Sequence, residues 1–153
     1  EIAAADWQDL RRVGEAAFVY RLEHSKTQQA GPSASATPDK PVLGRAGAAL
    51  DAWLRAANIS EGPLFRRLWG DRVGPALSPK AVAAIVQRRA VLAGLSGDFA
   101  GHSLRSGFIT EGGRQGVALP ALMALTEHRS VAQAIGYFQA GSVAENPAGR
   151  LLE

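Results

Sequence analysis

The 153-residue sequence contains no cysteine, one methionine and only three lysines. Without cysteine the chain can form neither disulfides nor thiolate metal sites, which is compatible with a reducing cytoplasm. No apolar run approaches the roughly 20 residues that a membrane-spanning helix needs, so we expect no membrane partner. The sequence also has no glycine-rich phosphate loop and no cluster of carboxylates.

The length and composition are those of one globular domain, residues 1–153. Hydrophobic residues make up 46% of the chain and charged residues 20%, which is ordinary for a soluble protein. The net charge is +3, and arginine supplies most of the positive charge. A basic surface favours binding to a phosphate backbone, but arginine and alanine enrichment can equally reflect a GC-rich genome. Charge by itself therefore decides nothing about function.

The residues best suited to chemistry gather in residues 101–137. His102 and Arg105 stand three positions apart, which places them on the same face of a helix. His128 follows, and Tyr137 comes nine residues later, in a segment that opens with Ser130 as an N-cap. Arginine binds phosphate oxygens through two charge-assisted hydrogen bonds, histidine moves protons near neutral pH, and tyrosine can be a nucleophile. The set suggests phosphoryl transfer with a tyrosine nucleophile.

This ordered set resembles the catalytic domain of the tyrosine recombinases, the phage-integrase family. The segments GHSLRSGF, EHRSVAQAIGYF and AGSVAENPAGRLLE carry the resemblance, which extends over nearly the whole chain. Glu127 departs from the family pattern, where glycine very often precedes this histidine. The resemblance implies an α+β fold that is mainly α-helical, with a small antiparallel β-sheet near the N-terminus.

The resemblance also implies roles for five residues in the cleavage and rejoining of double-stranded DNA. Tyr137 would attack the scissile phosphate and form a 3′-phosphotyrosyl link, while Arg105 would stabilise the transition-state charge. His128 would donate a hydrogen bond to the phosphate, and His102 would assist proton movement around the nucleophile. Lys26, in the sequence Ser-Lys-Thr, would protonate the leaving 5′-oxygen. No metal or other cofactor is implied, in keeping with the lack of a phosphate loop or carboxylate cluster.

The family further implies a bacterial or phage-encoded protein that acts in the cytoplasm on the nucleoid. Self-association into a tetramer on DNA would use the C-terminal tail, residues 141–153. The opening EIAAADW reads as the tail of a helix and resembles the segment that follows the family's first catalytic arginine. We therefore expect this arginine and an N-terminal DNA-clamping domain to precede the chain, which would be a catalytic-domain fragment.

Local patterns predict the secondary structure around these residues. Residues 16–22 have strand character, and the family places Lys26 on a β-hairpin here, although its return strand is weakly encoded. Helices are predicted over 45–57, 79–95, 103–115, 119–126 and 131–139, and a loop over 69–75. In the second of these helices the apolar residues expected to face inward are Val82, Ile85, Val86 and Ala90. Arg88 and Arg89 could bind phosphates or could simply favour the helix dipole.

Three readings of function stay open at this point. The first is a site-specific recombinase, and the second is a truncated or decayed recombinase that binds DNA without cleaving it. The third is an unrelated helical interaction domain, which would scatter the five side chains over different faces. Type IB topoisomerases share the catalytic logic, but the spacing and the tail are closer to the recombinases.

Overall fold

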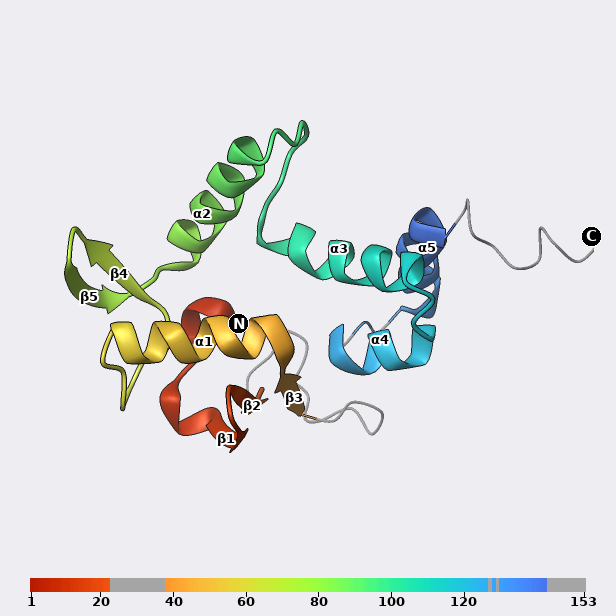
Figure 1. Ribbon diagram of the computed structural model, residues 1–153. Helices are drawn as coiled ribbons and strands as arrows, with labels where there is room; N and C mark the ends of the chain where they lie inside the picture. Colours follow the sequence, from red (N-terminus) through yellow and green to blue (C-terminus); the bar gives the residue numbers. More distant parts are fainter. Residues whose placement is uncertain (23–37, 127, 129, 143–153) are drawn as a thin grey trace, which may run out of the picture. The chain divides into compact units, whose positions relative to one another are not determined.

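The computed structural model describes residues 1–22, 38–126, 128 and 130–142, drawn in colour in Figure 1. They form two compact units, Glu1–Ile85 and Val86–Glu153, here called unit 1 and unit 2. Unit 1 contains the 3-10 turns η1 (Ile2–Ala4) and η2 (Trp7–Asp9), strands β1 (Leu10–Gly14), β2 (Ala17–Arg21) and β3 (Asp39–Val42), helix α1 (Gly44–Ala56), and strands β4 (Arg66–Trp69) and β5 (Arg72–Ala76). Helix α2 (Pro79–Leu92) contains the boundary, and unit 2 contains α3 (Gly101–Arg114), α4 (Leu119–Thr126) and α5 (Val131–Ser142).

The first three strands of unit 1 form an antiparallel sheet in the order β1-β2-β3, with α1 packed against it (Figure 1). Phe18 lies in the central strand opposite Arg12 and Val42, and it is one of the most deeply buried side chains. Its neighbours in the core include Leu54 from α1 and Leu64 from the segment that follows. The predicted α+β class, mainly helical with a small antiparallel sheet near the N-terminus, is confirmed.

Gly47 allows α1 to approach the sheet closely. A Cβ atom at this position would lie 2.0 Å from the carbonyl oxygen of Ala16 and 2.9 Å from that of Val42. Such contacts are shorter than any packed side chain tolerates, so only glycine fits where α1 crosses the β1–β2 turn. The predicted apolar stripe of α1 faces this core, with Leu54 buried and Leu50 and Trp53 partly buried.

Several local predictions are wrong in unit 1. Residues 69–75 are not a loop, because β4 and β5 form an antiparallel hairpin with Gly70 (φ +61°) in its two-residue turn. The glycine and proline of β5 look like loop residues in the sequence, but they lie at a bulge in the pairing. The opening residues form short 3-10 turns rather than the end of an α-helix.

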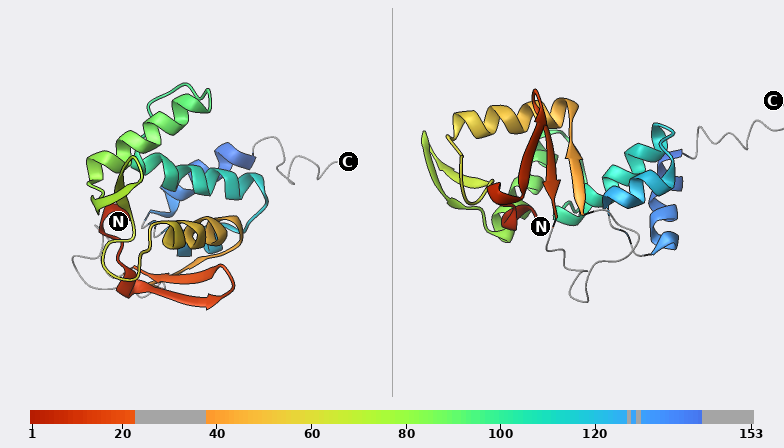
Figure 2. Two further views of the ribbon diagram at one scale, coloured as in Figure 1. Left: turned by 60° about the vertical axis from the view of Figure 1, so that its left-hand side comes forward. Right: turned by 90° about the horizontal axis from the view of Figure 1, so that it is seen from below.

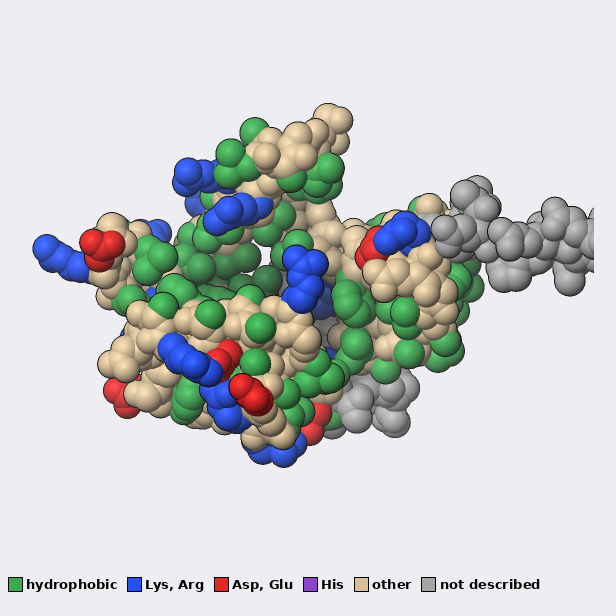
Figure 3. All heavy atoms as spheres, in the orientation of Figure 1, with side chains coloured by type: hydrophobic (Ala, Val, Ile, Leu, Met, Phe, Trp, Pro, Cys, Tyr) green, Lys and Arg blue, Asp and Glu red, His purple; other side chains and the backbone are tan. Residues whose placement is uncertain are grey.

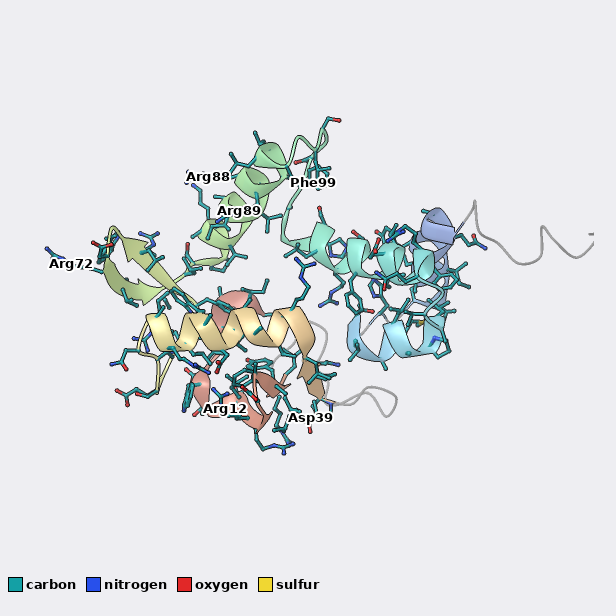
Figure 4. The ribbon with its side chains drawn as sticks, in the orientation of Figure 1. Arg12, Asp39, Arg72, Arg88, Arg89 and Phe99 are labelled. Atoms are coloured by element: carbon teal, nitrogen blue, oxygen red, sulfur yellow. The ribbon has the colours of Figure 1, made fainter. Side chains whose placement is uncertain are left out.

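Helix α2 is close to its predicted position but ends at Leu92. Ser78 caps it as expected, since its Oγ accepts a hydrogen bond from the Ala81 N–H at 3.2 Å. Ala90 is buried, whereas Ile85 is 46% exposed, so the prediction that Ile85 faces inward is wrong. Arg88 and Arg89 are both exposed and project from the helix in Figure 4.

Unit 2 is a group of three helices in which α3 packs against both α4 and α5, as the two views of Figure 2 show. Its core is small: the buried residues Ile109, Leu122 and Ala134, one from each helix. The predicted bounds of α4 are confirmed, and α3 and α5 agree within three residues at each end. No helix in the described part of the chain combines the length and the apolar character that crossing a membrane requires.

Candidate active site

The start of α3 sets the position of His102 and Arg105. The Ser103 Oγ accepts a hydrogen bond from the Ala100 N–H at 3.0 Å, which fixes the chain as it enters the helix. His102 lies in the first turn and is exposed, and Arg105 lies one turn later and is half-buried. Both side chains belong to the face predicted from their spacing.

Tyr137 is held by the packing of α5 on α3. Ser130 is the predicted N-cap of α5, and its Oγ accepts a hydrogen bond from the Gln133 N–H at 3.3 Å. Two turns further on, Tyr137 packs against the core of Ile109, Leu122 and Ala134. The phenol is therefore supported on one side by apolar contacts while its ring stays partly accessible.

Two glycines of α3 bring the neighbouring helices close to the site. A Cβ on Gly113 would lie 2.6 Å from the backbone oxygen of Phe138, the residue after Tyr137. A Cβ on Gly112 would lie 2.4 Å from a methyl group of Leu122 in α4. The absence of side chains at these two positions thus determines how near α4 and α5 come to α3.

His128 lies just beyond the end of α4 and next to Tyr137. The two ring centroids are 6.2 Å apart in an edge-to-face arrangement with an interplanar angle of 66°. The Nδ1 atom of His128 is 2.8 Å from Oγ1 of Thr126, the buried last residue of α4. Burial lowers the pKa of His128, and the nearby positive charges of Arg105 and His102 lower it further.

The structure thus brings four of the five predicted residues into one unit: His102 and Arg105 from α3, His128 after α4, and Tyr137 from α5. Arg105 and His102 are close enough to His128 to affect its pKa, and Tyr137 is in ring contact with it. A planar guanidinium and an imidazole near His128, with a phenol in contact with its ring, are suited to binding a phosphate and attacking its phosphorus atom.

Lys26, the fifth residue, lies outside the described residues, as do Glu127 and residues 143–153 of the C-terminal tail. The strands that flank residues 23–37 in the sequence pair with each other. The Leu22 N–H donates to the Pro38 carbonyl oxygen at 2.9 Å, and β2 pairs with β3 beyond it. The described strand that pairs with β2 on this side of the sheet is therefore β3, Asp39–Val42.

Sequence reasoning missed the contributions of Thr126 and Gly113. The sequence gave no indication of the role of Thr126, because a threonine at a helix end is common and its bond to His128 depends on the tertiary structure. The pair Gly112–Gly113 inside a predicted helix was the available indication, since glycine in a helix interior often marks a close contact. Within the described residues no three histidine, aspartate or glutamate side chains are grouped so that they could hold a metal ion.

Comparison with known proteins gives one informative similarity. Over 150 residues the chain is 33% identical to a protein named integrase/recombinase xerD homolog from Selenomonas ruminantium. The matched region covers 94% of this chain but 43% of the relative, so the chain spans less than half of the relative's length. No protein-family model matches the chain. The similarity agrees with the family resemblance drawn from the sequence motifs.

Proposed function

We propose that this chain is the catalytic part of a tyrosine-type site-specific recombinase that cleaves and rejoins double-stranded DNA. The observation that carries the proposal is the grouping of Tyr137, His128, Arg105 and His102 in unit 2. The similarity to a protein named as an integrase/recombinase supports the same reaction class. An unrelated interaction domain would give no reason for a phenol, two imidazoles and a guanidinium to lie together.

In the proposed reaction the Tyr137 oxygen attacks the scissile phosphorus while the bond from phosphorus to the 5′-oxygen breaks. The phenol proton passes to His102, and the leaving 5′-oxygen takes a proton from Lys26. Arg105 and His128 bind the non-bridging oxygens and stabilise the charge of the five-coordinate transition state. The product is a 3′-phosphotyrosyl link and a free 5′-hydroxyl.

The 3′-phosphotyrosyl link stores the energy of the broken bond, so the 5′-hydroxyl of another strand can attack it and release Tyr137. This reversal exchanges strands with no net consumption of water or nucleotide. Tetramer formation on DNA through residues 141–153 belongs to the same proposal.

Covalent trapping on DNA tests the proposal. The complete gene product that contains this chain is incubated with nicked duplexes tiled across the genomic DNA that flanks its gene. We expect an SDS-resistant protein–DNA adduct, with the nucleotide attached to the peptide that contains Tyr137. Tyr137→Phe removes the adduct. Tyr20→Phe is the matched control, because Tyr20 is the other tyrosine of the chain and lies in the sheet of unit 1.

Three results would count against the proposal. An adduct that persists in Tyr137→Phe would place the nucleophile elsewhere. Salt-sensitive binding to these duplexes without any adduct would favour a decayed recombinase that holds DNA but does not cleave it. The absence of both binding and adduct would overturn the assignment to DNA.

A further inference from the structure

We propose that Thr126 is a positioning residue that holds His128 in the tautomer with its proton on Nδ1. The inference starts from two hydrogen bonds at the end of α4. The Thr126 Oγ1 is 2.9 Å from the carbonyl oxygen of Leu122 and 2.8 Å from Nδ1 of His128. Thr126 is 8% exposed, so its hydroxyl group has little access to solvent.

Counting protons decides the direction of these bonds. A threonine hydroxyl has one proton, and a carbonyl oxygen has none. The contact between the two oxygens is attractive only if the hydroxyl donates to the Leu122 carbonyl. Nothing is then left to donate to His128, so the proton between Nδ1 and Oγ1 must belong to the ring. In the neutral imidazole the other nitrogen, Nε2, is consequently unprotonated.

This tautomer restricts what His128 can do for the phosphate. A neutral ring with its proton on Nδ1 offers only a lone pair at Nε2, and a lone pair repels a phosphate oxygen. His128 can donate to the phosphate from Nε2 only as the imidazolium, which carries protons on both nitrogens. Among the described residues, Arg105 and His102 from α3 lie near the ring, and the phenol of Tyr137 faces it from α5. A bound phosphate brings negative charge next to the ring and so stabilises the imidazolium.

The tautomer is measured without DNA, by long-range ¹H–¹⁵N correlation spectra of the histidine rings at a pH where His128 is neutral. In the wild-type chain we expect Nδ1 of His128 to be protonated and Nε2 to be bare. Thr126→Val keeps the shape of the side chain but removes the acceptor, so the ring should move toward the tautomer with Nε2 protonated. Thr126→Ser keeps the hydroxyl and should retain the wild-type spectrum. His128→Gln assigns the resonances.

A second readout rests on the proposed function. In the wild-type protein, adduct formation should fall by about tenfold per pH unit above the pKa of His128, because the imidazolium is lost. In Thr126→Val the neutral ring can itself donate from Nε2, so its rate relative to wild type should rise with pH by a similar factor. A spectrum with Nε2 protonated in the wild type, or no change in Thr126→Val, would overturn the inference. Absence of any adduct would count against the proposed function while leaving the spectrum as the test of Thr126.

An independent observation concerns the β4–β5 hairpin, for which we infer a contact with duplex DNA, again on the basis of the proposed function. Arg67 and Trp69 alternate onto one face of β4, and Arg72 lies directly opposite Trp69 on β5. Trp69 is 58% exposed, and its ring lies over Gly74, about 3 Å from where a Cβ would be. This face therefore presents an indole between two guanidinium groups.

The charges on this face suit a polyanion. Arg66 on the other face is engaged by the backbone oxygens of Pro63 and Glu61. Among the described residues neither Arg67 nor Arg72 has an ion-pair partner. Figure 4 shows Arg72 pointing away from the end of the hairpin, and Figure 3 shows basic side chains there beside one acidic group. A two-stranded ribbon fits the major groove of DNA, where arginines reach the phosphates.

Salt titration of binding to a 30-base-pair duplex tests this contact. If Arg67 and Arg72 each neutralise one phosphate, the double variant to glutamine should reduce the slope of log K against log salt by about 2. Arg11 and Arg45, exposed elsewhere in unit 1, give a matched double variant. Trp69 fluorescence should be quenched by the duplex, and this quenching should be lost in Trp69→Ala. If the Arg67/Arg72 double variant binds the duplex with the wild-type salt slope, the hairpin contact alone is overturned. If the wild-type protein does not bind the duplex, the proposed function is overturned as well.

Discussion

The two units of this protein use their charged residues in different ways. In unit 1, Asp51 is buried in α1 and is paired with Arg12 from β1 and Arg55 from the next turn. Arg12 also lies over the Phe18 ring, with its guanidinium carbon 4.5 Å from the ring centroid. The hydrogen bond from Arg12, together with the charges of Arg12 and Arg55, lowers the pKa of the Asp51 carboxyl. These charges hold a sheet and a helix together.

In unit 2 the polar groups serve a different purpose. The core consists of three buried residues, and the ion pair between Glu111 and Arg114 lies on the surface, where such pairs contribute little. Burial and the nearby charges of Arg105 and His102 instead lower the pKa of His128, which lies beside Tyr137. The difference teaches that unit 1 pairs its buried charge with opposite charges, whereas unit 2 places positive groups near one another where chemistry is proposed.

The largest expected effect comes from Arg105. Arg105→Gln should reduce the rate of adduct formation by about 10²–10³, since it removes a donor to the transition-state oxygens. The rate is measured by trapping on the same nicked duplexes. Arg114→Gln is the control on the same helix, because Arg114 pairs with Glu111 on the surface. Equal rates for Arg105→Gln and the wild type would remove Arg105 from the site.

The second largest effect is expected on the folding stability of unit 1. Gly47→Ala would put a methyl group against two backbone carbonyls, which cannot move aside as a side chain can, so we expect a loss of about 3 kcal/mol. All three tryptophans lie in unit 1, so tryptophan fluorescence follows its unfolding. Gly14→Ala, whose Cβ would meet an ordinary contact of 3.4 Å, is the control. Equal denaturation midpoints for the two variants would contradict the close approach of α1.

A glycine-to-alanine substitution in unit 2 should destabilise the protein less than Gly47→Ala, and it should also affect the candidate active site. Gly113→Ala pushes against the backbone of Phe138, so we expect about 2 kcal/mol of destabilisation and a displaced Tyr137. Gly107→Ala is matched on the same helix, because its Cβ would have open space around it. That control should be stabilising, as alanine is the better helix former. Amide hydrogen exchange in α3 and α5, together with the rate of adduct formation, distinguishes the two variants.

The smallest effect is the response to acid. The folded-state pKa of His128 is lowered, so its contribution to stability is present above its ordinary pKa of about 6.5 and is lost as the pH falls through the lowered value. Asp51 behaves likewise around its own lowered pKa, below about 4. Protection of unit 2 amides should therefore weaken at a higher pH than protection of unit 1 amides. In His128→Gln the weakening of unit 2 amide protection at the higher pH should disappear. If this weakening persists in the variant, a group other than His128 causes it.

Much of the helical part of the fold could be predicted, because capping residues and apolar spacing are local. Ser78-Pro79 marks the start of α2, and Leu119 to Thr126 is recovered as α4 with its predicted bounds. The β4–β5 hairpin was missed because glycine and proline in β5 suggest a loop unless its pairing with β4 is known. Ile85 was misjudged because a pattern indicates which residues are apolar but not which face of the helix is covered.

The sequence by itself determined the chemical groups and their order: an imidazole and a guanidinium one helical turn apart, then a second imidazole, then a phenol. Residue identity and helical spacing are local properties, so no structure is needed to read them. Only the tertiary structure decided that His128 meets Tyr137, that Gly113 lets α5 approach, and that Thr126 bonds to the ring. These contacts depend on how helices pack and on where a single hydroxyl proton goes, which residue spacing along the chain does not fix.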